Sequence, residues 1–189
     1  MRCLPVPCRA SRALCSLLCL TWLAIGAAPT QAKVFYARDE ALRLAFPDAD
    51  RVETRDVFLT VAQRAAIEAR AKSTLESDLL TLYVGHRGAA VIGYAVIDTR
   101  TVRTLPETFL VVLSPQGAVA AMHLLAFYEP LEYSPPNRWL AQFHDVTLSD
   151  ELRVGRGVVA ITGSTLTSEA VVGGVRRALA IYDVVVAGG

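Results

Sequence analysis

Four hydroxyl side chains crowd one short turn of the sequence, with a fifth just behind them. The turn reads Ile161-Thr162-Gly163-Ser164-Thr165-Leu166-Thr167-Ser168 and follows the β-branched run 158–161, which is typical of a strand. Apolar residues at helical spacing come after it. The first N–H groups of a helix lack intrahelical acceptors, and the helix dipole adds partial positive charge there. The turn therefore predicts an anion site, although Ser and Thr also favour an ordinary helix N-cap.

The other residues that could do chemistry are dispersed along the chain. His86, His123 and His144 lack the short pairing of a zinc site, so we interpret each as structural. No G-x-S-x-G, P-loop or G-x-G-x-x-G motif is present, which argues against hydrolases, NTPases and dinucleotide-binding proteins. Ser164 has no base at a spacing that would activate it. The sequence therefore predicts neither a catalytic residue nor a metal site.

The elements that must position the turn form an α+β pattern. Strand-like runs, joined in part by short turns, occupy residues 51–59, 79–85, 89–99, 107–113 and 118–128. Such short connections imply antiparallel pairing, because parallel strands need long crossovers. Helical patterns occupy 37–46, 60–72 with a capping-box start, 137–143 and 168–182, and the tail 184–186 reads as a last strand or a frayed end. We expect an antiparallel sheet of about four to five strands with helices packed on one face.

The C-terminal helix is expected to bury its apolar stripe against this sheet. The stripe repeats at three- and four-residue steps, at Val171, Val172, Val175, Leu179 and Tyr182. The pair at 173–174 is Gly-Gly, and each Gly costs a helix about 1 kcal/mol relative to Ala. The pair therefore indicates either a close approach to the sheet or a ligand, or a local break in the helix.

Residues 1–32 have the pattern of a secretory signal peptide. Three arginines precede the apolar run 13–28, whose 16 residues fall short of the roughly 20 that a spanning helix needs. Cleavage after Ala32 would leave one domain, residues 33–189, and an uncleaved N-terminal membrane anchor is the alternative. All four cysteines lie in this segment, so the domain would contain no disulfide, thiolate metal site or cysteine nucleophile.

The charge balance argues against a nucleic-acid partner. The chain has 19 basic and 18 acidic side chains, and the first 32 residues hold three of the basic ones and none of the acidic ones. The domain after them therefore has a net charge of −2 and no basic patch. We expect an exported, periplasmic protein that is soluble or anchored to the inner membrane.

The order of residues in the turn is more specific than its composition. Residues 162–168 resemble the "S/T-G-A-T-L-T-S" signature of the FMN-binding domain family, which includes the flavin-carrying subunits of the Rnf complex and of the sodium-translocating NADH:quinone oxidoreductase. The helix that follows resembles the family pattern "TS-x-A-V-x-x-x-V-x-x-A-L". The stretch 128–133, followed by Trp139 and Gln142-Phe143, resembles a variant of the family's "E-T-P-G-x-G…W…Q-F" segment.

The resemblance implies an FMN cofactor and assigns residues to it. In the family a flavin transferase joins the FMN phosphate to the last Thr of S/T-G-A-T, which corresponds to Thr165. Glu129 would lie close to the flavin-bearing turn, or in a solvated loop with Glu132. We interpret Trp139 and Phe143 as core rather than as a stacking platform, and Tyr128 and Tyr133 stay open as ring contacts. The implied cofactor-binding residues are Glu129, Thr162, Gly163, Ser164, Thr165, Leu166 and Thr167.

The implied function is that of a covalent flavoprotein in electron transport, an electron carrier rather than an enzyme with its own substrate. A flavin transferase would be a transient partner, and a membrane electron-transfer complex a further one. The sequence departs from the family pattern at Val159, where the usual residue is Asp, and at Ser164, where it is Ala. One alternative is an accessory or binding module of the same fold that has lost covalent loading. Another is a protein that binds FMN non-covalently.

Overall fold

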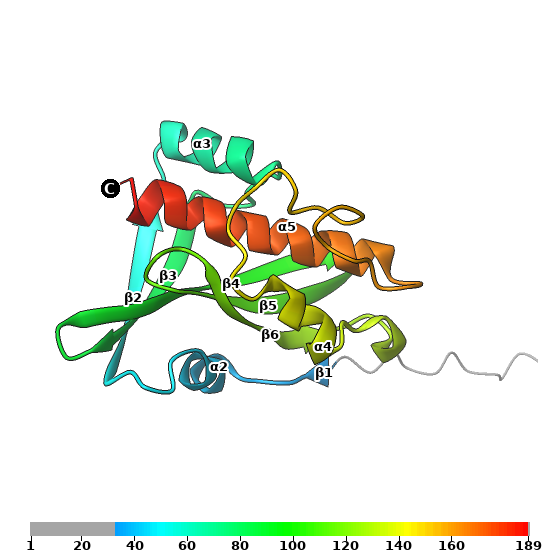
Figure 1. The fold of residues 1–189 in the computed structure, drawn as a ribbon, viewed down its shortest axis with the longest axis horizontal. Coiled ribbons are helices and arrows are strands. Elements are labelled where there is room, and N and C mark those ends of the chain that lie inside the picture. Colours follow the sequence, from blue (N-terminus) through cyan, green and yellow to red (C-terminus); the bar gives the residue numbers. More distant parts are fainter. Residues whose placement is uncertain (1–32, 189) are drawn as a thin grey trace, which may run out of the picture. The chain divides into compact units, whose positions relative to one another are not determined.

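The computed structural model describes residues 33–188, which build an antiparallel sheet flanked by helices (Figure 1). The predicted signal segment, with its four cysteines, and Gly189 lie outside the described residues. The strands are β1 (Lys33–Val34), β2 (Arg51–Phe58), β3 (Leu79–Arg87), β4 (Ala90–Val102), β5 (Leu105–Leu113) and β6 (Val119–Phe127). Each neighbouring pair in the order β1-β6-β5-β4-β3-β2 is antiparallel. The short turns between β3 and β6 require this pairing, because parallel strands need long crossovers.

The α+β class is confirmed, but the sheet has six strands rather than four or five. The additional strand is β1, which pairs Lys33 with Phe127 and Val34 with Ala126 at the end of β6. Two residues are too few to show the alternation that identifies a strand in a sequence. The weak strand expected at 51–59 is present as β2 and pairs with β3 along its whole length.

The helices are α2 (Arg38–Ala45), α3 (Val61–Ala71), α4 (Asn137–Leu140) and α5 (Thr165–Ile181), with short 3-10 turns η2 (Leu131–Tyr133) and η3 (Ala141–Phe143). The predicted capping box of α3 is confirmed, because Thr60 and Gln63 exchange side-chain and backbone hydrogen bonds. The tail continues α5 as the π-helical turn η4 (Tyr182–Val186) instead of forming a strand. None of the helices between residues 33 and 188 is long and apolar enough to cross a bilayer.

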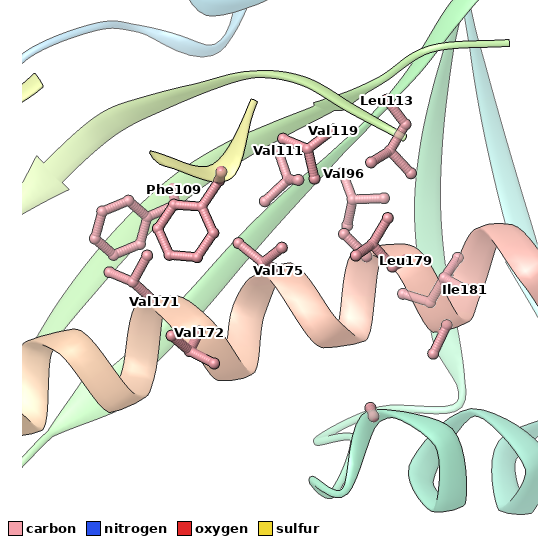
Figure 2. Packing of buried hydrophobic residues seen from close by; sticks show 14 of the residues in the cluster. Val96, Phe109, Val111, Leu113, Val119, Val171, Val172, Val175, Leu179 and Ile181 are labelled. Atoms are coloured by element: carbon pink, nitrogen blue, oxygen red, sulfur yellow. The ribbon is translucent and has the colours of Figure 1, made fainter. Parts of the chain in front are cut away.

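Two apolar clusters cover the two faces of the sheet. Along β5, Val111 and Leu113 belong to the cluster under α5, whereas Leu110 and Val112 belong to the cluster under α2, since successive strand residues point to opposite faces. Figure 2 shows the α5 stripe facing side chains of the sheet. Four of the five expected stripe residues are buried, and Tyr182 is half-buried. Because α2 packs on the second face, helices lie on both faces rather than on one.

The glycine pair of α5 marks a close approach to the sheet and not a break, because the helix is continuous from Thr165 to Ile181. A Cβ atom on Gly174 would lie 2.9 Å from Oδ2 of Asp98 on β4. A Cβ atom on Gly173 would meet only Nη1 of Arg177, at 3.2 Å. The absence of a side chain at Gly174 therefore lets α5 lie against a carboxylate of β4.

The two glycines should respond differently to substitution by Ala. We expect Gly174→Ala to lower the free energy of unfolding by about 1–3 kcal/mol, since the added methyl group overpacks against Asp98. Gly173→Ala is the matched control, because its clash is milder and Ala gains about 1 kcal/mol of helix propensity. Urea unfolding measures both, and equal effects would contradict this account of Gly174.

Two arginines of α5 are buried and hold the helix to its surroundings. Arg176, 5% exposed, donates to the main-chain carbonyls of Arg70, Ala71, Ser149 and Leu152 at 2.6–3.2 Å. Arg177, 4% exposed, donates from Nε and Nη2 to the two carboxylate oxygens of Asp98, at 2.9 and 2.5 Å. These bonds fasten α5 to the end of α3, to the loop 149–152 and to β4, and so fix the helix that begins at the candidate site.

Candidate functional site

The helix α5 begins at Thr165, three residues before the expected start at Ser168. Gly163 has φ 82° and turns the chain, after which the Ser164 N–H donates to the Ile161 carbonyl at 3.0 Å. Ser168 ties this turn from inside the helix: its Oγ accepts from the Ile161 N–H at 2.9 Å and donates to the Ser164 carbonyl at 3.0 Å. Thr167 and Ser168 are buried in the first turn of the helix, and the residue at the N-cap position is Ser164.

The first turn of α5 has free hydrogen-bond donors. The residue at the N-cap position, Ser164, makes no side-chain cap bond. Within residues 33–188, no acceptor is found for the backbone N–H groups of Thr165, Leu166 and Thr167. Unpaired N–H groups at the start of a 17-residue helix, together with the helix dipole, favour an anion.

A cavity of about 140 Å³ lies against this turn. It brings together six of the seven predicted cofactor residues, namely Glu129, Gly163, Ser164, Thr165, Leu166 and Thr167. The seventh, Thr162, is exposed and does not line the cavity. Val102, Arg103 and Tyr133 complete the wall. Sites that enclose a whole small molecule have volumes of about 300–1,000 Å³, so this cavity fits one part of a larger ligand.

Sequence reasoning missed two charged residues of this region. Arg103 lies in the β4–β5 turn with φ 55° and lines the cavity, but a single Arg in a turn carries no signal of its own. Glu107 opens the apolar segment 107–113, whose pattern predicts a plain strand, yet its side chain is fully buried. Burial, together with the charges of Glu129 and Asp98, raises the pKa of Glu107 to about 8.

Residues 158–161, which lead into the site, form a loop and not a strand, although their β-branched side chains are typical of a strand. Side chains of another segment hold the backbone of this loop. The Trp139 indole N–H donates to the Val159 carbonyl at 2.6 Å, and the Val159 N–H donates to Oε1 of Gln142 at 3.0 Å. Trp139 packs edge-to-face on Phe143, with ring centroids 5.4 Å apart. Phe143 is fully buried in the core, as expected, whereas Trp139 is half-buried and lies against the core. The segment 139–143 therefore positions the chain that leads into the turn.

The three histidines lie apart from this cavity. His86 contacts Glu53 across β2 and β3, and His144 contacts Asp145 at the surface. His123 on β6 lines a larger cavity of about 670 Å³, which contains none of the predicted cofactor residues. The smaller cavity, rather than the larger one, is therefore the candidate site.

Comparisons with known proteins bear on what this arrangement binds. No family model matches the chain. Over 158 residues it is 30% identical to one subunit of the Na⁺-translocating ferredoxin:NAD⁺ oxidoreductase complex of Acetobacterium woodii. The match covers 78% of this chain and 72% of that relative.

Proposed function

The chain belongs to the FMN-binding domain family, and on this premise we propose that it is an electron-transfer flavoprotein whose FMN is joined through its phosphate to Thr165. The observation that supports this most is the start of α5, where the exposed Thr165, three free N–H groups and a cavity coincide. A phosphate group there would meet hydrogen-bond donors and partial positive charge. Arg103, which lines the cavity, adds a full positive charge.

The residues present fit a phosphoester. No atom lies within 4 Å of the position of a Cβ on Gly163, so the backbone there is open to approach. Attachment would join the Thr165 Oγ atom to the FMN phosphorus of FAD, with loss of the hydroxyl proton and of AMP. The transferase, not this chain, would supply magnesium and the base for that step.

The domain would carry electrons and not transform a substrate of its own. The bound isoalloxazine ring supplies one- and two-electron chemistry, and the protein supplies position and electrostatics. The cavity would hold the phosphate and the adjoining part of the ribityl chain rather than the whole flavin, since its volume is below that of a site for a whole ligand. Glu129, with one buried oxygen that has no hydrogen-bond partner among residues 33–188, offers an acceptor for a hydroxyl group of the ribityl chain.

Partners and location follow from the relative and from the N-terminal sequence. The similar protein is a subunit of an oxidoreductase complex that links ferredoxin and NAD⁺. We infer that this chain exchanges electrons with a membrane electron-transfer complex and meets a flavin transferase transiently. The signal-like segment before Lys33 supports export to the periplasm, with or without retention at the inner membrane.

The test of the function is intact mass after co-production with an active flavin transferase. The purified protein should be yellow and heavier by FMN less one water, and the flavin should survive denaturation and precipitation. Flavin that is released on denaturation would instead establish non-covalent binding. Colourless protein of unmodified mass would favour the accessory module that has lost covalent loading. The sequence feature that supports this alternative is Val159, where the family usually has Asp.

Val159 gives a second prediction about loading. Its side chain is 75% exposed six residues before Thr165, where a transferase could contact it. We expect Val159→Asp to raise the fraction of protein that carries FMN, measured by mass under limiting transferase. Val159→Asn is the matched control for the charge. An unchanged fraction in Val159→Asp would show that the transferase does not recognise this position.

A further inference from the structure

Two carboxyl groups, of which that of Glu129 lines the cavity, have buried oxygens without a hydrogen-bond partner in the part of the chain that the structure describes. Both oxygens of Glu107 and one oxygen of Glu129 are buried and unpaired within residues 33–188. Glu107 is fully buried, although Asp and Glu are almost never fully buried unless they are paired. A lone buried carboxylate is costly, and the group takes up a proton instead.

The sheet register brings the two carboxyl groups into one region. Glu107 on β5 pairs with Phe127 at the end of β6, and Glu129 follows two residues later and lines the cavity. The charge of Glu129 is a cause of the raised pKa of Glu107, second only to burial. The charge of Glu129 therefore acts on the carboxyl group of Glu107.

Within residues 33–188, no salt bridge is found for Glu107 or for Glu129, although charged residues lie on the neighbouring elements. On β4, Asp98 is held by Arg177 of α5, and Arg100, which pairs with Glu107 in register, binds Glu76 and the Thr74 carbonyl. Arg103 lines the cavity from the β4–β5 turn, and no salt bridge is found for it within residues 33–188. On the segment after β6, Tyr133 lines the cavity and Glu132 is exposed.

We propose that Glu107 holds a proton at neutral pH, and that with Glu129 beside it this carboxyl group forms a proton-binding site whose occupancy responds to negative charge beside Thr165. Glu107 is the group that binds the proton, and Glu129 is the group that lines the cavity. A negative group at the start of α5 makes a second carboxylate less favourable, so the proton is held more tightly. The proton-binding site does not depend on the proposed cofactor. The phosphate of FMN at Thr165 would be one negative group that raises its proton occupancy.

The proton is measured directly on flavin-free protein labelled with ¹³C at the glutamate carboxyl groups. One glutamate should titrate with a midpoint near 8, and its signal should vanish in Glu107→Gln. Glu129→Gln should lower this midpoint by removing a like charge, whereas Glu132→Gln, an exposed carboxyl of the same segment, should leave it unchanged. The absence of a glutamate that titrates above pH 6, or an unchanged midpoint in Glu129→Gln, would overturn the proposal.

The response of the Glu107 midpoint to negative charge in the cavity is tested on flavin-free protein. Thr165→Asp places a carboxylate at the first residue of α5 and should raise the Glu107 midpoint by roughly half a unit to one unit at low salt, and by less at high salt. Thr165→Asn is the uncharged control and should not move it. Equal midpoints in the two variants would contradict the link between the pair and the cavity. Because flavin is absent, failure of FMN loading cannot imitate either result.

The pH dependence of the free energy of unfolding provides another test, because a purely structural role of Glu107 would not change this dependence. Glu107 keeps its proton in the folded state up to about pH 8 but loses it near pH 4.5 when unfolded. The wild type should therefore lose stability relative to Glu107→Gln as the pH rises from about 5 to 8, and the difference should level off above that. Parallel stability profiles for the two proteins would also overturn the proposal.

Discussion

Thr165→Ala is expected to abolish covalently bound flavin and to leave the fold intact. Thr165 is exposed, and no side-chain hydrogen bond is found for it within residues 33–188. Its loss should change the free energy of unfolding by less than about 0.5 kcal/mol, as for most surface substitutions. Flavin fluorescence of the denatured protein and intact mass measure the loading, and urea unfolding measures the stability.

The matched control for this prediction is Thr162→Ala. Thr162 is a second exposed threonine of the turn, but it lies outside the cavity wall, so this variant should retain its flavin. Ser164 and Thr167 are buried and therefore poor acceptors. Covalent flavin in Thr165→Ala, or an FMN mass on a peptide that lacks Thr165, would end the assignment.

Asp98→Ala is expected to have the largest effect on stability. Asp98 accepts two hydrogen bonds from Arg177, and the two side chains are 15% and 5% exposed. The substitution leaves a buried guanidinium without its carboxylate, which costs about 3–5 kcal/mol. Urea unfolding followed by circular dichroism gives the loss in free energy of unfolding.

An exposed ion pair on the same helical layer provides the comparison. Arg70 and Asp183 lie 3.1 Å apart, with side chains 54% and 35% exposed. Asp183→Ala should cost at most about 1 kcal/mol, because solvent screens such a pair. Similar losses in Asp98→Ala and Asp183→Ala would show that burial does not set the contribution of the Asp98 pair.

Local patterns sufficed to predict most of the sheet and α3. The meander from β3 to β6 follows from alternating apolar residues and short turns, and the start of α3 follows from its capping box. The two-residue β1 could not be predicted, because its pairing depends on the distant end of β6. The position of α2 on the second face is likewise set by a cluster that includes Tyr83 and Leu125.

The candidate site was predictable as a set of residues but not in its detail. Several hydroxyl residues in succession could each cap a helix, and the contacts of Ser168 with Ile161 and Ser164 decide where α5 begins. The run 158–161 resembles a strand, but Trp139 and Gln142 hold its backbone where a strand partner would. Glu107 was not recognised, because its burial arises in the folded sheet, where β5 lies between β4 and β6, and not from its neighbours in sequence.

The pairing of β1 determines which end of the domain a tether would hold. Lys33, the first described residue, pairs with Phe127, and Phe127 pairs with Glu107, so these three residues form one row across the sheet. The chain therefore enters the sheet in the row of Glu107, near the cavity that Glu129 lines. An N-terminal tether would therefore be attached at this end of the sheet, and not at the β3–β4 turn. Such tethering would raise the effective concentration of a flavin at Thr165 towards a redox partner embedded in the membrane.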